Sequence, residues 1–229
     1  MTYPGGKAGD GVYQKIINLM PPHRAYVEPF LGGGAIMRLK KPAACSIGID
    51  ADGDVIEAWR GVIIPPNLTV LQGSALDWLK GCVDGVNCVS PDTLIYCDPP
   101  YLLSTRKQHR LIYRCELLEG GHRVLLAILR CLRCMVMISG YWSSLYAEEL
   151  HDWRSVSFQA RTRGGSMATE WVWMNFPEPL ELHDYSFLGN DFRERERIKR
   201  KIQRWKRRLS EMPVLERHAM MGAISQLRR

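Results

Sequence analysis

Short apolar segments alternate with amphipathic helical patterns along most of this chain, and this alternation constrains the fold more than any other feature. The pattern predicts strands at 25–28, 45–50, 69–72, 93–97, 135–139, 155–160 and 170–176. It predicts helices at 34–40, 54–62, 75–82 and 121–134, after a first helix that runs from a cap at Asp10 to Met20. Strands that alternate with helices form βαβ units. We therefore expect an α/β fold with a mainly parallel sheet of seven strands, covered on both faces.

The last two predicted strands differ from the others because no helix separates them. About nine residues rich in Gly and Arg lie between them, which predicts a hairpin that closes one edge of the sheet. The chain has 229 residues, of which 46% are hydrophobic and 24% charged. These proportions exclude disordered, collagen-like and coiled-coil proteins, and the length suits one α/β domain with a small appendage.

The sequence also bears on compartment and metal content. No apolar stretch reaches the roughly 18 residues of a membrane-spanning helix, and the N-terminus lacks the apolar region of a signal peptide. We therefore expect a cytosolic protein. The seven Cys are an odd number, which favours reduced thiols in the core. Cys131 and Cys134 form the one close pair, and we interpret it as a buried helix end because no second pair completes a metal site.

The excess positive charge is confined to the C-terminal end. Residues 193–229 hold 13 Lys and Arg against 4 Asp and Glu, whereas residues 1–192 hold 18 against 20. The spacing of apolar residues there predicts a helix with one apolar stripe, made by Ile198, Ile202, Trp205, Leu209 and Met212. This helix either docks on the domain or pairs with a second copy, and its basic faces favour binding to nucleic acid.

A second helix is predicted after the basic one. It opens at Pro213 and covers 212–227, and its apolar residues are expected to point inward. These residues are Leu215, Met220, Ile224 and Leu227. We interpret this helix as structural.

A glycine-rich turn follows the first predicted strand. Phe30-Leu31-Gly32-Gly33-Gly34 opens a helix, so its glycines allow a ligand to approach the backbone N–H groups closely. The next strand ends at Asp50, where α/β nucleotide folds place a carboxylate for the two hydroxyls of a ribose. Asp52 and Asp54 are alternatives, but Asp50 lies directly at the strand end. Together these features predict a nucleoside-containing cofactor.

The fourth predicted strand ends in Asp98-Pro99-Pro100-Tyr101, the most specific motif of the chain. Two prolines hold their carbonyls rigidly beside a carboxylate and a phenol ring. An exocyclic amine on a heterocycle must localise its lone pair before it can attack a methyl donor. Acceptors at Asp98 and the Pro99 carbonyl favour that geometry, and the Tyr101 ring can stack on the base.

These motifs, in this order, resemble those of the Dam-type (D12 class) DNA adenine-N6 methyltransferases. Tyr3-Pro4-Gly5-Gly6-Lys7, the Glu28–Ala35 turn, Asp98–Tyr101, Ile138–Tyr141 and Glu170–Trp173 carry the resemblance over roughly residues 1–176. It implies a Rossmann-like S-adenosylmethionine-dependent methyltransferase fold with basic C-terminal helices, and no metal. It implies cofactor binding by Tyr3, Lys7, Glu28, Phe30, Gly32, Gly34, Asp50 and Asp98. It implies catalysis by Asp98, Pro99, Pro100 and Tyr101.

The chain departs from that family in two places. Only 23 residues separate Ser74 from Asp98, which leaves no room for the family's recognition domain. Ser74 also stands where a carboxylate or amide often meets the adenine of the cofactor. We therefore expect a methyltransferase domain over 1–190, a basic extension over 191–229, and short or relaxed sequence preference. A compact enzyme of this kind would suit a bacterial or phage-infected cell.

The partner expected from these features is DNA, double-stranded rather than single-stranded, with no membrane involved. The candidate DNA-binding residues come from the segment after the catalytic motif, the hairpin tip and the basic helix. They are Arg106, Lys107, Arg110, Arg161, Arg163, Arg193, Lys199, Lys201 and Arg204. Phosphate contacts of this kind position a duplex without reading its sequence. An RNA base or a protein amide as acceptor, and a DNA-binding protein without catalysis, stay open as alternatives.

Overall fold

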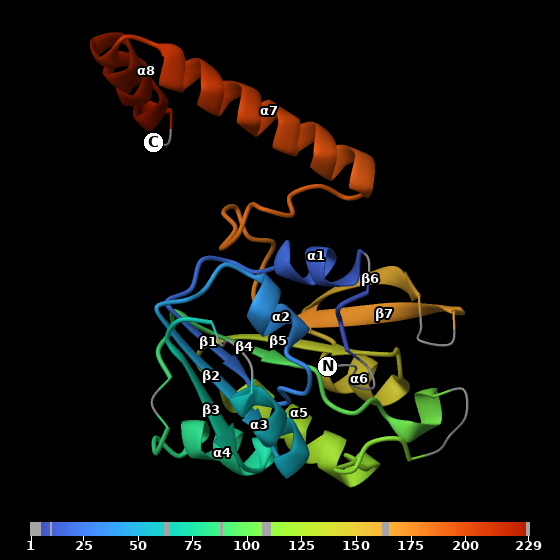
Figure 1. Ribbon diagram of the computed structural model, residues 1–229. Coiled ribbons are helices and arrows are strands. Elements are labelled where there is room, and N and C mark those ends of the chain that lie inside the picture. Colours follow the sequence, from blue (N-terminus) through green and yellow to red (C-terminus); the bar gives the residue numbers. More distant parts are fainter. Residues whose placement is uncertain are drawn as a thin grey trace. The chain divides into compact units, whose positions relative to one another are not determined.

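The computed structural model describes residues 6–9, 11–61, 65–87, 89–106, 111–161 and 165–227 (Figure 1). Of the candidate site residues, Tyr3, Lys107, Arg110 and Arg163 lie outside the described residues. The chain divides into two compact units, residues 1–185 and residues 186–229. We call them the first and the second unit.

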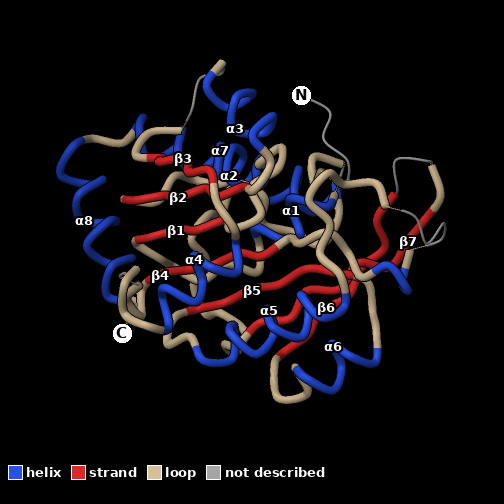
Figure 2. The backbone as a smooth tube through the Cα atoms, turned by 90° about the horizontal axis from the view of Figure 1, so that it is seen from below, coloured by secondary structure: helices blue, strands red, loops and turns tan. Residues whose placement is uncertain are grey.

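The first unit is built on a sheet of seven strands in the order β3-β2-β1-β4-β5-β7-β6 (Figure 2). β1, β2, β3, β4 and β5 run parallel, whereas β7 is antiparallel to both β5 and β6. The strands are β1 (Ala25–Glu28), β2 (Cys45–Asp50), β3 (Leu68–Gln72), β4 (Thr93–Cys97), β5 (Met135–Gly140), β6 (Arg154–Arg161) and β7 (Met167–Met174). The expected Rossmann-like α/β fold with a terminal hairpin is therefore confirmed.

Helices cover both faces of this sheet. In Figure 2, α1 (Val12–Ile17), α2 (Ala35–Leu39) and α3 (Gly53–Arg60) lie on one face. On the other face lie α4 (Ala75–Val83), α5 (Glu119–Cys131) and α6 (Ser144–Glu149), and a 3-10 turn, η1 (Leu103–Thr105), follows β4. The part of the chain that the structure describes contains no helix with the length and apolarity needed to span a membrane.

The core explains why β4 lies at the centre. All five residues of β4 are buried, which matches its continuous apolar run. Between the sheet and α5, Leu125, Leu126 and Leu129 pack against Ile95 and Val136. α5 places these leucines on one side because they recur at helical spacing. The carboxyl ends of β1, β2 and β4 are thereby held side by side.

Two helix ends differ from the prediction. The first helix has Gly11 as its N-cap, at φ 87°, and Asp10 lies outside the described residues. α5 ends at Cys131, so Cys134 belongs to the approach to β5 and not to a helix end. Cys134 is buried and Cys131 is exposed. The spacing of apolar residues changes from helical to alternating at Leu132. The backbone of Leu132 is already extended.

The second unit consists of α7 (Phe192–Glu211) and α8 (Val214–Gln226). The Asp191 side chain caps α7 by accepting from the Glu194 N–H at 2.8 Å. Leu215, Met220, Ile224 and Leu227, which were expected to point inward, are not covered by α7 and are exposed. Neither helix contains a buried residue, since apolar side chains in α8 point in several directions and α7 is dominated by charge.

We expect the turn after β1 to depend on the absence of a side chain at Gly34. This residue has φ 57°, and an added Cβ would lie 2.2 Å from the Trp59 ring. Gly34→Ala should lower the free energy of unfolding by about 2 kcal/mol or more. Gly120→Ala, in α5 with open space around it, should be neutral or slightly stabilising. Urea unfolding of both variants checks this, and equal losses would contradict it.

Candidate active site

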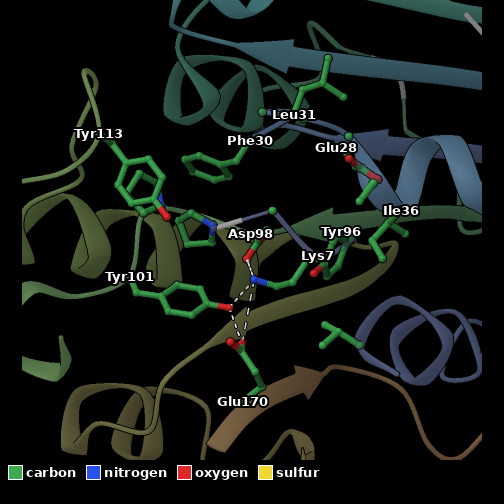
Figure 3. A pocket seen from close by; sticks show the side chains of 18 of the residues that line it. Lys7, Glu28, Phe30, Leu31, Ile36, Tyr96, Asp98, Tyr101, Tyr113 and Glu170 are labelled. Atoms are coloured by element: carbon green, nitrogen blue, oxygen red, sulfur yellow. Dashed lines mark hydrogen bonds and ion pairs between the residues drawn. The ribbon is translucent and has the colours of Figure 1, made fainter. Parts of the chain in front are cut away.

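One cavity of about 1240 Å³ opens at the carboxyl ends of the parallel strands. Figure 3 shows it from close by, with Asp98 near its centre. The expected catalytic and cofactor-binding residues that the structure describes all line it: Lys7, Glu28, Phe30, Gly32, Gly34, Asp50, Asp98, Pro99, Pro100 and Tyr101. The carboxyl edge of a parallel sheet is where folds of this class bind their ligands.

The glycine turn is held in shape by the side chain at the end of β2. Asp50 Oδ2 accepts from the Gly32 N–H at 2.8 Å, and its Oδ1 accepts from the Asp52 N–H at 2.9 Å. Burial raises the pKa of Asp50 above its ordinary value, although these backbone bonds act against the rise. Asp52 instead caps α3. Asp50 is therefore the carboxylate of the three that is built into the turn.

Asp98 is held by one of its two oxygens. Its Oδ1 lies 2.8 Å from the Lys7 Nζ and accepts from the Ser139 hydroxyl at 2.7 Å. Among the residues that the structure describes, none hydrogen-bonds to Oδ2 of Asp98. Lys7 is 7% exposed and Ser139 1%. The carboxylate is thus fixed in orientation, and its side chain, which is 19% exposed, lines the cavity.

The Tyr101 side chain is also held in place by hydrogen bonds and by a ring contact. Its hydroxyl accepts from Lys7 Nζ at 2.6 Å and donates to Glu170 Oε2 at 2.5 Å (Figure 3). Its ring meets that of Tyr141 edge to face, with centroids 4.7 Å apart. Burial, followed by the charges of Asp98 and Glu170, holds the pKa of Tyr101 well above its usual value. The phenol therefore stays neutral.

Lys7 connects these groups electrostatically. Burial alone would lower the pKa of Lys7, but the neighbouring Asp98 and Glu170 outweigh that effect and raise it above its ordinary value. The ammonium is therefore charged. Sequence analysis missed Glu170 and Ser139 as site residues. The signal for Glu170 is a single acid in the apolar strand β7, and for Ser139 a hydroxyl after four apolar residues of β5.

Glu28 also lies in the cavity wall, where burial changes its protonation state. It is 4% exposed, and Oε1 accepts from the Tyr26 hydroxyl at 2.7 Å. Burial raises the pKa of Glu28 to about 8. Burial likewise lowers the pKa of the neighbouring Lys40 to about 8. Glu28 is therefore mostly protonated at neutral pH, and it adds no full negative charge to the site.

The segment after the Asp98–Tyr101 motif is held by a buried ion pair. The Arg106 guanidinium donates to both carboxylate oxygens of Glu116, at 2.8 and 2.7 Å, and to the Tyr101 carbonyl at 2.7 Å. Arg106 is 9% exposed. This corrects the expectation that Arg106 contacts DNA phosphate, because its donors are used within the protein. Further along, Arg114 pairs with Asp52 and Asp54.

The remaining expected residues fall in two groups. Arg161 at the end of β6 is exposed and lines the cavity, and the basic candidates of α7 are all exposed, namely Arg193, Lys199, Lys201 and Arg204. Ser74 lines the cavity and caps α4, where its hydroxyl accepts from the Asp77 N–H at 3.3 Å. The described residues contain no cluster of three or more His, Cys, Asp or Glu that could hold a metal ion.

Comparison with known proteins finds solved structures that are similar to this chain at low sequence identity. Neither a protein-family model nor a curated protein sequence matches it. Human methyltransferase-like protein 13 in complex with SAH is 13% identical, with a TM-score of 0.47, over 84% of this chain and 89% of that one. An O-methyltransferase from Bacillus cereus in complex with SAH is 12% identical, with a TM-score of 0.46, over 72% and 79%. A dimethyladenosine transferase from Plasmodium falciparum is 14% identical, with a TM-score of 0.44, over 72% and 61%.

The protonation of Glu28 predicts a pH-dependent stability. The folded state holds this proton up to about pH 8, whereas the unfolded chain releases it near 4.5, so raising the pH between these values destabilises the fold. Glu28→Gln removes this loss. Its advantage in unfolding free energy over the wild type should grow by about a few kcal/mol from pH 5 to pH 8 and then level off. Urea unfolding across this range measures it, and a difference that stays constant with pH would refute the assignment.

The Arg106–Glu116 pair predicts a large cost when one partner is removed. Glu116→Ala leaves a buried guanidinium without its carboxylate, which should cost about 3–5 kcal/mol in unfolding free energy. The matched control is Glu119→Ala, which breaks the exposed pair between Glu119 and Arg123. That change should cost at most about 1 kcal/mol. Comparable losses in the two variants, measured by urea unfolding, would contradict the structural role of the buried pair.

Proposed function

We propose that this protein transfers a methyl group from S-adenosylmethionine to the N6 amine of adenine in DNA. The observation that carries the proposal is the state of Asp98. Its Oδ1 is held by Lys7 and Ser139, and its side chain lines the cavity together with Pro99 and Pro100. An oriented acceptor of this kind suits a planar amine that must lose one of its two hydrogens during the reaction.

The cavity also suits a nucleoside-containing methyl donor. Its volume of about 1240 Å³ exceeds the roughly 300–1,000 Å³ of typical small-molecule sites, so it has room for a donor and a base together. Asp50 keeps lone pairs beyond its two backbone bonds and can accept from ribose hydroxyls. Gly32 and Gly34 allow close approach to the turn, and Phe30 adds an aromatic face. When bound, the donor supplies an electrophilic methyl group on a sulfonium.

The chain's own residues then account for the amine chemistry. Asp98 Oδ2 and the Pro99 carbonyl accept the two amine hydrogens, which favours the geometry in which the nitrogen lone pair points at the methyl carbon. As the N–C bond forms and the C–S bond breaks, the nitrogen becomes positive. The adjacent carboxylate stabilises that charge, and the proton finally released passes to water. Tyr101, locked by Lys7 and Glu170, offers a ring on which the base can stack.

DNA is the acceptor we favour because of the exposed basic residues. Arg161 lies at the cavity, and α7 carries Arg193, Lys199, Lys201 and Arg204 on its surface. Arg106 is no longer part of the set. Contacts of this kind release counterions and position a phosphate backbone without reading bases. Together with the short connection before Asp98, they support relaxed sequence preference on duplex DNA.

The decisive experiment measures transfer of labelled methyl from S-adenosylmethionine to unmethylated duplex DNA, with the modified bases mapped. We expect N6-methyladenine, and a loss of about 100-fold or more in rate for Asp98→Asn, because the amide cannot replace the carboxylate beside a developing positive charge. Asp84→Asn, an exposed change at the end of α4, is the matched control and should leave the rate unchanged.

The acceptor is tested in the same assay. Label on RNA or on protein but not on DNA would overturn the proposed acceptor. Donor binding without transfer to any of these acceptors would overturn the catalytic proposal and favour a DNA-binding protein that has kept the fold. A methylated sequence of four or more fixed bases would contradict relaxed recognition.

A further inference from the structure

Glu170 is a buried carboxylate that the chemistry above does not require as an amine acceptor. It lies in β7 and is 9% exposed, in a strand whose next residues are Trp171, Val172 and Trp173. Burying a charged carboxylate among apolar residues is costly unless it is paired. Its partners are the Tyr101 hydroxyl at 2.5 Å and the Lys7 ammonium at 3.9 Å. Packing alone does not explain why a carboxylate occupies this buried position.

The charges around Lys7 do not cancel. One ammonium faces two carboxylates, Asp98 at 2.8 Å and Glu170 at 3.9 Å, so this group of three has a net charge of −1. Figure 3 shows the three side chains converging on one wall of the cavity. With Asp98 alone, Lys7 would be neutralised and no excess would remain. Glu170 therefore sets the sign of the charge at this wall.

The other groups that line the cavity do not offset this excess, and Asp50 at the end of β2 adds a further carboxyl group to the lining. Arg106 and Glu116 neutralise each other as a buried pair. Glu28 is mostly protonated at neutral pH, because burial raises its pKa to about 8. Tyr101 stays neutral. Arg38 and Arg161 also line the cavity, but both are exposed, so water and salt screen their charges.

We propose that Glu170 makes the site discriminate by charge, so that it binds the cationic methyl donor more tightly than the neutral thioether left after transfer. This inference rests on the proposed function. S-Adenosylmethionine and S-adenosylhomocysteine share the adenosine and amino-acid groups and differ in the methyl group and the positive charge. Without Glu170, the ammonium of Lys7 and the carboxylate of Asp98 would leave this wall with no net charge, so the wall would give no electrostatic preference for either ligand. The second carboxylate supplies that reason, and in a partly buried site it is weakly screened.

Glu170 has a second effect through Tyr101, which must be separated from the first. Its carboxylate accepts the phenol hydrogen and so helps to orient the ring. Glu170→Gln removes the charge but keeps an oxygen that can accept from the phenol. Tyr101→Phe does the reverse, because it removes the hydrogen bond and keeps both carboxylates. Glu170→Asp keeps the charge on a shorter side chain.

The experiment measures by calorimetry the affinity of each full-length variant for S-adenosylmethionine and for S-adenosylhomocysteine. We expect Glu170→Gln to lower the ratio of donor to product affinity by about tenfold, which equals about 1.4 kcal/mol. Glu170→Asp should restore most of the ratio, and Tyr101→Phe should leave the ratio within about twofold of the wild type. Glu178→Gln removes an exposed carboxylate that pairs with Arg154 and should leave the ratio unchanged.

The outcomes separate the inference from the function on which it rests. Equal losses of affinity for both ligands in Glu170→Gln would show a purely structural role and overturn the inference, while the proposed donor would stand. An unchanged ratio would overturn it in the same way. If the wild type binds neither ligand, the proposed donor is wrong and the inference fails with it. Thermal unfolding of each variant with no ligand identifies any loss that comes from folding.

Discussion

A buried ammonium group joins parts of this chain that are far apart in sequence. Lys7 precedes the first helix, Asp98 and Tyr101 follow the central strand, and Glu170 belongs to the antiparallel β7. Each of these charges would be costly to bury alone, and each is stabilised by the others at hydrogen-bond or ion-pair distance. The segment before α1 is thereby tied to the Asp98–Tyr101 motif. The geometry of the whole candidate site depends on this group.

The conformation of the glycine turn is likewise fixed by side chains, which hydrogen-bond to its backbone. The Gly32 N–H donates to Asp50, and the Gly32 carbonyl accepts from the Trp59 indole at 2.9 Å. Both polar groups of one residue are therefore satisfied by neighbouring elements, β2 and α3. The Trp59 ring also occupies the space where a side chain at position 34 would lie. The open part of the cavity is bounded by a turn whose conformation is set before any ligand arrives.

Local patterns predicted most elements and the overall sheet, but not the exact register of the hairpin or the surroundings of α8. The central strands are found at or within one residue of their expected bounds, because a short continuous apolar run is a strong local signal. The hairpin is longer than expected, since β7 begins at Met167, where Met167 pairs with Arg161 in a register that the sequence does not reveal. α8 was expected to pack inward, but no partner surface is encoded in its own periodicity.

In the candidate site, too, local motifs were predicted and residues brought in by strand pairing were missed. Its motif residues were predicted because each motif is contiguous. Ser139 and Glu170 were missed because they reach the site only through the pairing of β5 with β4 and of β7 with β5. Arg106 was expected to contact DNA from its basic surroundings, whereas its partner Glu116 lies ten residues further on. Charge density in a sequence does not say which guanidinium groups are already satisfied within the fold.

The place of β7 in the sheet has a consequence for how the site comes into being. β7 lies between β5 and β6, so the edge strand β6 can join the sheet only through β7. Lys7 and Glu170 come from nearly opposite ends of the first unit. The site is therefore made of contacts with large sequence separation, which fold slowly and are lost together. A first unit interrupted before β7 would retain the glycine turn and the Asp98–Tyr101 motif but lack the wall that contains Glu170. The complete site therefore forms only when the whole first unit has folded.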